Sequence, residues 1–233
     1  MPRDIPIGNG HLLVNFDDSY RLRDIYFPHV GKENQSAGHP FRVGLWIDGQ
    51  FSWVHDEPWT IKLRYERDTL ATDVTLTRPD LGIDIHCADV VDFHEYVLVR
   101  KVVVTNHASR PRAVRLFFCQ DFHISEQEVG DSAYYDPGPR ALIHYKDDRW
   151  FLMNGRVESA PAGFDQWAVG TKESPGHEGT WRDAEDGELS GNSVVQGAVD
   201  SVGALHATVP ASGSTTIWYW LACGFSHQEV QDA

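Results

Sequence analysis

Short stretches in which apolar and polar residues alternate run along most of the chain. Residues 41–47 place Phe, Val, Leu and Ile at every second position. Successive side chains of a strand point to opposite faces, so this alternation is typical of a β-strand with one buried face. Asp48-Gly49 follows at once and tolerates positive φ, so it predicts a two-residue hairpin turn. Further stretches with strand-like patterns are 50–53, 59–65, 72–76, 83–87, 97–104, 114–118, 141–145, 150–153 and 214–221.

Helical periodicity is missing before residue 225, where no dozen-residue segment carries a convincing apolar stripe. Short strands punctuated by 20 Gly and 12 Pro predict an all-β fold. The number of strands favours a large antiparallel sandwich of two stacked sheets, with few short helices. No internal repeat or low-complexity linker divides the chain, so we expect residues 1–225 to form one β-sandwich domain.

The last residues carry a helix-start signal. Ser226-His227-Gln228-Glu229 is a capping box, in which Ser and Glu side chains bond backbone N–H groups of the first helical turn. We interpret residues 226–233 as the start of a helical linker, too short to bury anything by itself. The sequence therefore reads as the front part of a longer polypeptide.

Composition excludes several classes of function. The 233 residues are 41% hydrophobic and carry a formal net charge of −14, which fits a globular chain repelled by nucleic acid and by anionic membranes. No apolar run approaches the roughly 20 residues that span a bilayer, and the N-terminus lacks a signal-peptide core. Cys87, Cys119 and Cys223 are far apart and odd in number, which favours buried thiols in a reducing compartment. We expect a cytoplasmic protein.

The tripeptide Asp-Phe-His occurs twice and supplies one candidate site. If both copies lie on neighbouring strands, Asp92, His94, Asp121 and His123 face the same side and form one polar cluster. His and carboxylate suit a divalent metal, but the spacing matches no ligand pattern such as H-x-x-x-H. We therefore expect no metal or other cofactor. The alternative is an Asp–His patch that faces water or another domain.

A second candidate lies between two expected strands. Tyr134, Tyr135 and Asp136 precede Pro137-Gly138-Pro139 and lack a core pattern, so we expect a stiff loop. Two rings beside a carboxylate suit contact with a sugar. They suit packing against another domain equally well, because aromatic residues are enriched at interfaces.

Several longer strings point to a family. They are Gly8-Asn9-Gly10, 13–17, 22–34, 46–53, Asp121-Phe122-His123, 133–137 and 179–187. In this order, and over essentially the whole chain, the sequence resembles the N-terminal domain of bacterial and archaeal glucoamylase-like enzymes of glycoside hydrolase family 15.

The resemblance implies a β-supersandwich related to galactose-mutarotase-like folds. In the family, helical linkers and an (α/α)₆ barrel follow, and the barrel carries two catalytic glutamates that hydrolyse α-glucosidic bonds with inversion. This chain lacks the barrel, so it inherits no catalytic residue and is expected to be inactive alone. Its expected partners are such a barrel, in cis or as a separate chain, and an α-glucan or α-glucoside substrate.

Two other functions fit the same sequence. One is a freestanding carbohydrate-binding module. The other is an aldose epimerase of the mutarotase type, which needs a general acid and base across a sugar pocket, with His94 or His123 as candidates.

Overall fold

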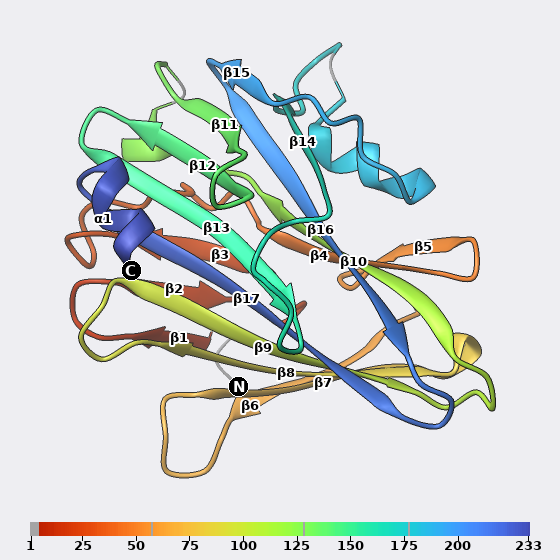
Figure 1. The fold of residues 1–233 in the computed structure, drawn as a ribbon. Coiled ribbons are helices and arrows are strands. Elements are labelled where there is room, and N and C mark those ends of the chain that lie inside the picture. Colours follow the sequence, from red (N-terminus) through yellow and green to blue (C-terminus); the bar gives the residue numbers. More distant parts are fainter. Residues whose placement is uncertain (1–4, 57, 128, 177) are drawn as a thin grey trace.

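The strand-rich pattern of the sequence is reproduced in a computed structural model that describes residues 5–56, 58–127, 129–176 and 178–233. Its strands pair antiparallel into three sheets (Figure 1). The nine-stranded sheet contains, in spatial order, β15 (Val194–Gln196), β11 (Ser132–Asp136), β12 (Ala141–Lys146), β13 (Arg149–Val157), β17 (Ser214–Gly224), β9 (Val97–Asn106), β8 (Ile83–Val91), β7 (Thr72–Arg78) and β6 (Thr60–Tyr65).

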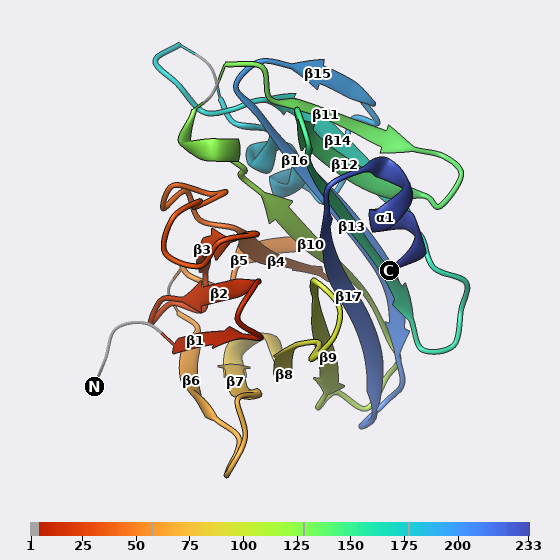
Figure 2. The ribbon, with the colours of Figure 1, turned by 90° about the vertical axis from the view of Figure 1, so that its left-hand side faces the viewer.

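The opposite layer is built from the two smaller sheets. The five-stranded sheet has the order β14 (Gln166–Thr171), β16 (Val199–Val209), β10 (Arg112–Gln120), β4 (Arg42–Ile47) and β5 (Gln50–Trp53). The three-stranded sheet consists of β1 (Ile5–Gly8), β2 (Leu13–Phe16) and β3 (Leu22–Tyr26). A single bridge between Leu22 and Phe41 links these two sheets, so together they face the nine-stranded sheet (Figure 2). The expected all-β sandwich is confirmed, with a third sheet in addition.

Helical segments are short. They are the 3₁₀ turns η1 (Pro79–Leu81), η2 (Ile124–Glu126) and η3 (Thr180–Asp186), and the helix α1 (His227–Asp232). Over the ranges that the structure describes, no helix is long and apolar enough to cross a membrane.

Apolar side chains at alternate positions of the strands fill the space between the layers. On β9, Leu98, Val102 and Val104 are fully buried in the main apolar cluster, whereas Lys101 between them is exposed. This burial of one strand face is the driving force that holds the two layers together.

The predicted hairpin is confirmed. Ile47 pairs with Gln50, and the turn residues Asp48 and Gly49 have φ values of 51° and 81°. Such positive φ at both central positions is what the two-residue turn requires.

The C-terminal helix forms where the capping box predicts it. The Ser226 hydroxyl accepts a hydrogen bond from the Glu229 backbone N–H at 3.3 Å, and a Glu229 carboxylate oxygen accepts one from the Phe225 N–H at 2.8 Å. The expectation that this helix buries nothing is wrong. Val230 is buried in an apolar cluster on the outer face of β13 and β17, which supplies the packing that a single turn lacks.

A buried ion pair between β8 and β9 of the nine-stranded sheet is also contacted from the opposite layer. Arg100 Nε lies 2.6 Å from Asp89 Oδ1, and both side chains are buried. Asp89 Oδ2 accepts hydrogen bonds from the hydroxyls of Tyr20 at 2.7 Å and Thr72 at 2.6 Å. The Arg100 guanidinium also lies 4.6 Å from the centre of the Tyr20 ring. Tyr20 belongs to the turn between β2 and β3, so this network attaches the three-stranded sheet to the nine-stranded one.

Replacing Arg100 by Met should destabilise the protein by about 3–5 kcal/mol, because it leaves the Asp89 carboxylate buried without its counter-charge. Urea unfolding followed by far-UV circular dichroism measures the change. The double variant Asp89→Leu/Arg100→Met should recover part of the loss. The control Arg67→Ala, at an exposed turn, should stay within about 0.5 kcal/mol of wild type. An Arg100→Met variant as stable as wild type would contradict the role assigned to the pair.

Candidate functional site

The first Asp-Phe-His copy lies in the turn between β8 and β9 and not on a strand. Asp92 Oδ1 accepts hydrogen bonds from the backbone N–H groups of His94 at 2.8 Å and Glu95 at 2.9 Å. A carboxylate that bonds the backbone two and three residues ahead stabilises a turn. These bonds also lower the pKa of Asp92. The expected strand geometry is therefore wrong for this copy, because the aspartate shapes its own turn.

The second copy follows β10 and has different partners. Asp121 Oδ1 lies 2.9 Å from the buried Lys172 Nζ, and Asp121 Oδ2 lies 3.8 Å from His39 Nδ1. His123 stacks on His39 with ring centres 5.2 Å apart. Asp121 and His123 therefore belong to a semi-buried charged group on the five-stranded layer, separate from the β8–β9 turn. The structure does not assemble the four-residue cluster that the repeated tripeptide suggested.

Asp200 lies close to this charged group. It is buried on β16, and its Oδ1 accepts a hydrogen bond from the Thr180 N–H at 3.1 Å. Burial and, to a smaller extent, the negative charge of Asp121 raise the pKa of Asp200 to about 7, although the hydrogen bond from Thr180 lowers it. No sequence signal marks Asp200, because its environment is created by β14, β16 and η3 together.

The tyrosine segment is a strand and not a loop. Residues 132–136 form β11, which pairs with β12 and β15. Tyr135 points to the main core and stacks on Trp167 with ring centres 3.6 Å apart, whereas Tyr134 lies in the outer apolar cluster beside α1. This alternation shows why the expected loop is wrong: the two adjacent rings serve opposite faces of the sheet.

Asp136 holds the C-terminal helix. Its Oδ2 lies 3.2 Å from His227 Nε2 and accepts a hydrogen bond from Gln231 Nε2 at 3.3 Å. Its Oδ1 accepts one from the Gly138 N–H at 2.9 Å. Asp136 therefore fixes α1 to the edge of the outer sheet face.

The Asn9 side chain of the Gly8-Asn9-Gly10 string connects two loops at one end of the sandwich. Asn9 Nδ2 donates hydrogen bonds to the backbone oxygens of Asp92 at 2.9 Å and Glu95 at 3.0 Å. Asn9 Oδ1 accepts from the N–H groups of His11 and Leu12. One amide thus fixes the β1–β2 loop to the β8–β9 turn. Both loops face the viewer in Figure 2.

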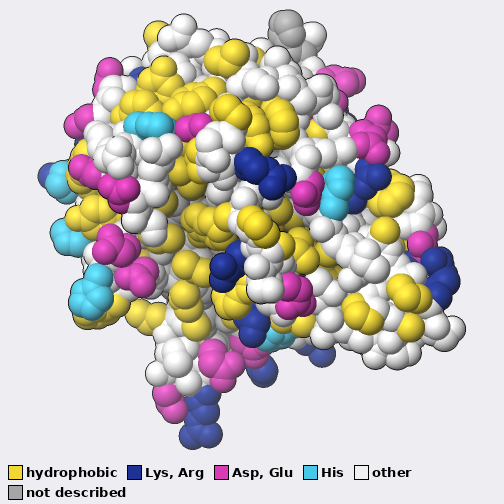
Figure 3. Space-filling view, viewed as in Figure 1, with side chains coloured by type: hydrophobic (Ala, Val, Ile, Leu, Met, Phe, Trp, Pro, Cys, Tyr) yellow, Lys and Arg dark blue, Asp and Glu magenta, His cyan; other side chains and the backbone are white. Residues whose placement is uncertain are grey.

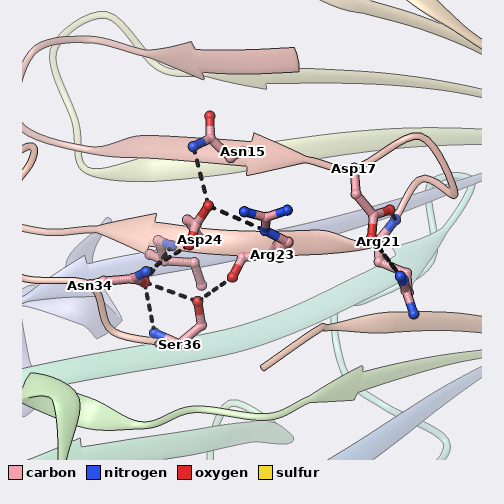
Figure 4. Close-up of polar contacts among 8 residues, drawn as sticks. Asn15, Asp17, Arg21, Arg23, Asp24, Asn34 and Ser36 are labelled. Carbon is pink, nitrogen blue, oxygen red and sulfur yellow. Dashed lines mark hydrogen bonds and ion pairs between the residues drawn. The ribbon is translucent and has the colours of Figure 1, made fainter. Parts of the chain in front are cut away.

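The Leu22–Asn34 string forms a second polar network at β2 and β3 (Figure 4). Asp24 Oδ1 accepts a hydrogen bond from Asn34 Nδ2 at 2.7 Å, and Asp24 Oδ2 accepts one from Asn15 Nδ2 at 3.3 Å. Asn34 Oδ1 accepts from the Ser36 hydroxyl at 3.0 Å, and that hydroxyl also lies 2.7 Å from the Arg23 backbone oxygen. Asp24, Asn34 and Ser36 are buried, so the network anchors the segment after β3.

Large apolar side chains are exposed on these anchored loops. The exposed fractions are 82% for Phe93, 42% for Val30 and 39% for Phe225. Phe225 contacts the buried Phe27, whose ring also contacts Tyr96, with ring centres 5.3 Å apart in both pairs. We name Val30, Phe93, Tyr96 and Phe225 the loop-end surface. Exposed aromatic and aliphatic groups held by rigid loops are the usual composition of a binding surface.

In the part of the chain that the structure describes, no group of three or more His, Cys, Asp or Glu residues lies close enough together to hold a metal ion. Most titratable candidates already have protein partners, as Asp92, Asp121 and Asp136 show.

Comparison with solved structures finds the same fold in proteins of very different sequence. A bacterial glucoamylase, solved in complex with acarbose, matches 96% of this chain with a TM-score of 0.73 and 12% identity. A proposed kojibiose phosphorylase from the human microbiome matches 99% with a TM-score of 0.56 and 8% identity. A Synechocystis protein matches 97% of this chain over 97% of its own length, with a TM-score of 0.56 and 9% identity.

Coverage differs among these proteins. The chain spans 32% of the glucoamylase and 32% of the phosphorylase. No protein-family profile and no curated sequence matches this chain. At these identities the likeness establishes a shared fold, a β-sandwich that occurs as about a third of larger sugar-active enzymes.

Asp200 should make stability depend on pH. Its folded pKa of about 7 exceeds the unfolded value of about 3.9, so between these values only the folded state retains the proton and stability falls as pH rises. The variant Asp200→Asn keeps an oxygen acceptor for Thr180 and lacks this titration. Its stability relative to wild type should rise by about 1 kcal/mol per pH unit from pH 4 to 7.

Urea unfolding of both proteins at several pH values provides the measurement. Asp68→Asn, at an exposed turn, is the control and should run parallel to wild type. Parallel curves for Asp200→Asn as well would show that Asp200 does not titrate in this range.

Proposed function

We propose that this chain is the non-catalytic β-supersandwich domain of a glucoamylase-like exo-α-glucosidase of glycoside hydrolase family 15. In this proposal it packs against an (α/α)₆ catalytic domain, in cis or as a separate chain, and shapes the entrance of that domain's pocket. The main support is the loop-end surface, where apolar groups are exposed on loops that hydrogen bonds of Asn9 and of the buried Asp24 hold in place. The 32% coverage of the glucoamylase chain is consistent with a domain that has a large companion.

Rigidity of the loops favours a protein partner at this end. A surface already held in its bound conformation loses little entropy on docking, so more of its contact energy contributes to affinity. Phe93 and Phe225 supply the aromatic anchors that dominate interface energetics. Arg149 lies 5.5 Å from the centre of the Phe225 ring and pairs with Glu33 at 2.9 Å, which orders the side chains around that anchor.

Asp136 and Tyr134 have an indirect role in this proposal. Both lie on the face that carries α1, and Asp136 bonds the helix directly. We assign them to the positioning of α1 at the domain contact, whereas Tyr135 serves the core.

Catalysis is assigned to the companion domain. Inverting hydrolysis needs two carboxyl groups about 6.5–9.5 Å apart with room for a water between them. The carboxyl groups that the sequence singles out here are engaged in turns, ion pairs or helix contacts. A reducing, cytoplasmic location is part of the proposal, supported by three free and buried cysteines.

Replacing Phe93 by Asp should weaken association with the (α/α)₆ domain encoded in the same genome by at least tenfold, measured by isothermal titration calorimetry with purified domains. The introduced charge would be desolvated in the contact. Leu70→Asp is the matched control, since Leu70 is 64% exposed in the β6–β7 turn and lies outside the loop-end surface. Equal affinities for both variants, or no association of the wild-type chain, would refute the proposed contact.

The purified chain should release no glucose from maltose, isomaltose, dextran or trehalose, because it lacks the paired glutamates of the barrel. A coupled glucose-oxidase assay over several hours measures release. Sustained turnover that is lost on substitution of a residue in this chain would overturn the non-catalytic assignment.

A further inference from the structure

A groove crosses the outer face of the nine-stranded sheet over β13, β17 and β9. It has a volume of about 350 Å³, within the range of small-molecule sites, and is lined by Val97 and Val99 of β9, Trp218 and Trp220 of β17, and Arg156 of β13. Figure 3 shows hydrophobic side chains gathered along the middle of this face, over β13, β17 and β9. Helix α1 covers only the adjoining part of the apolar surface.

Strand register places charged groups on both sides of Trp218. Trp218 pairs with Arg156 on one neighbouring strand and Lys101 on the other, so the three side chains form one row across the sheet. Lys101 Nζ lies 5.7 Å from the centre of the Trp218 ring. In the next row, Trp220 lies between Asn154 and Val99. The groove thus has half-buried aromatic walls with N–H donors beside them.

Arg156 is the second observation that points to a ligand. It is exposed and, among the residues that the structure describes, makes no ion pair in a chain of net charge −14. No described residue that lines the groove has an acidic side chain, and Ala233, the last residue of the 233, completes the lining next to α1. Arg156 and Lys101 therefore flank the Trp218 indole with N–H groups that can donate hydrogen bonds to the oxygen acceptors of a ligand.

We propose that this groove binds an oligosaccharide. The apolar C–H face of a pyranose ring would stack on the Trp218 and Trp220 indoles, while its hydroxyl or carboxylate oxygens accept hydrogen bonds from Arg156 and Lys101. The core of a protein–protein interface is usually depleted of charge, whereas here two charged groups flank the central indole. This inference rests on the proposed function as a domain of a sugar-active enzyme, and it adds a substrate-holding site outside the catalytic pocket.

Titration of the 233-residue chain with two probes, maltohexaose and tri-galacturonate, tests the proposal by isothermal calorimetry and tryptophan fluorescence. Binding of either probe is expected, and tighter binding of tri-galacturonate would identify the carboxylate as the group that the cations recognise. Trp218→Leu keeps an apolar side chain but removes the flat ring, and should weaken binding tenfold or more. Trp218→Phe should retain most of it.

Arg156→Ala provides a surface variant that leaves the apolar packing intact, and should also weaken binding severalfold. Arg67→Ala, at the exposed β6–β7 turn, is the matched control and should bind like wild type. Absence of binding of both probes at millimolar concentration overturns the proposal. So does binding that Trp218→Leu leaves unchanged, or a dimer in sedimentation analysis that Trp218→Leu abolishes. The companion-domain titration is independent of this result, so each proposal can fail without the other.

Discussion

The buried Asp89–Arg100 pair and the Tyr20 side chain that reaches it form the main polar contact between the two layers. Burying a carboxylate and a guanidinium is costly, and the cost is offset only if both groups meet fixed partners. Here those partners come from the nine-stranded sheet through Thr72 and from the β2–β3 turn through Tyr20. The directional contacts of Tyr20 with this pair thus add to the apolar packing of the three-stranded sheet against the nine-stranded one.

At the loop end and on the outer sheet face, ordered polar contacts hold exposed aromatic side chains in place. At the loop end, Asn9 and Asp24 satisfy backbone and side-chain groups so that apolar residues can be presented on ordered loops. On the outer sheet face, the strands themselves provide the order, and register alone brings Arg156 and Lys101 to the sides of Trp218. In both places polar contacts create the geometry, and aromatic side chains provide the contact area.

Local signals were sufficient for much of the fold. The β4–β5 hairpin was predictable because Asp48-Gly49 dictates its turn, and α1 because Ser226 and Glu229 cap it. Strand β16 was not predicted, since Asp200, Ser201 and Gly203 interrupt its apolar positions and have low strand propensity. Tertiary packing decides it: a Cβ at Gly203 would lie 2.6 Å from the Phe164 ring, so the strand needs a residue without one.

The candidate site was less predictable for a physical reason. The repeated Asp-Phe-His suggested a cluster. Instead Asp92 accepts hydrogen bonds from the backbone of its own turn and Asp121 forms an ion pair with Lys172, an outcome that depends on where each strand ends. Asn9 was noticed only as part of a recognisable string, because its two acceptors are 83 and 86 residues away in the chain. Hydrogen bonds between residues so far apart in the chain produce no recognisable pattern in the local sequence.

The three free cysteines have a practical consequence for studying motion in this protein. Cys87 lies in the main core and Cys119 in the apolar cluster under η3, whereas Cys223 lies on β17 next to the helix. Burial raises the pKa of Cys87 to about 12 and also raises the pKa of the other two thiols, so none reacts readily while its surroundings stay closed. The alkylation rate of each thiol therefore reports how often its own part of the sandwich opens, so that wild-type protein contains three local probes of transient unfolding without any label being introduced.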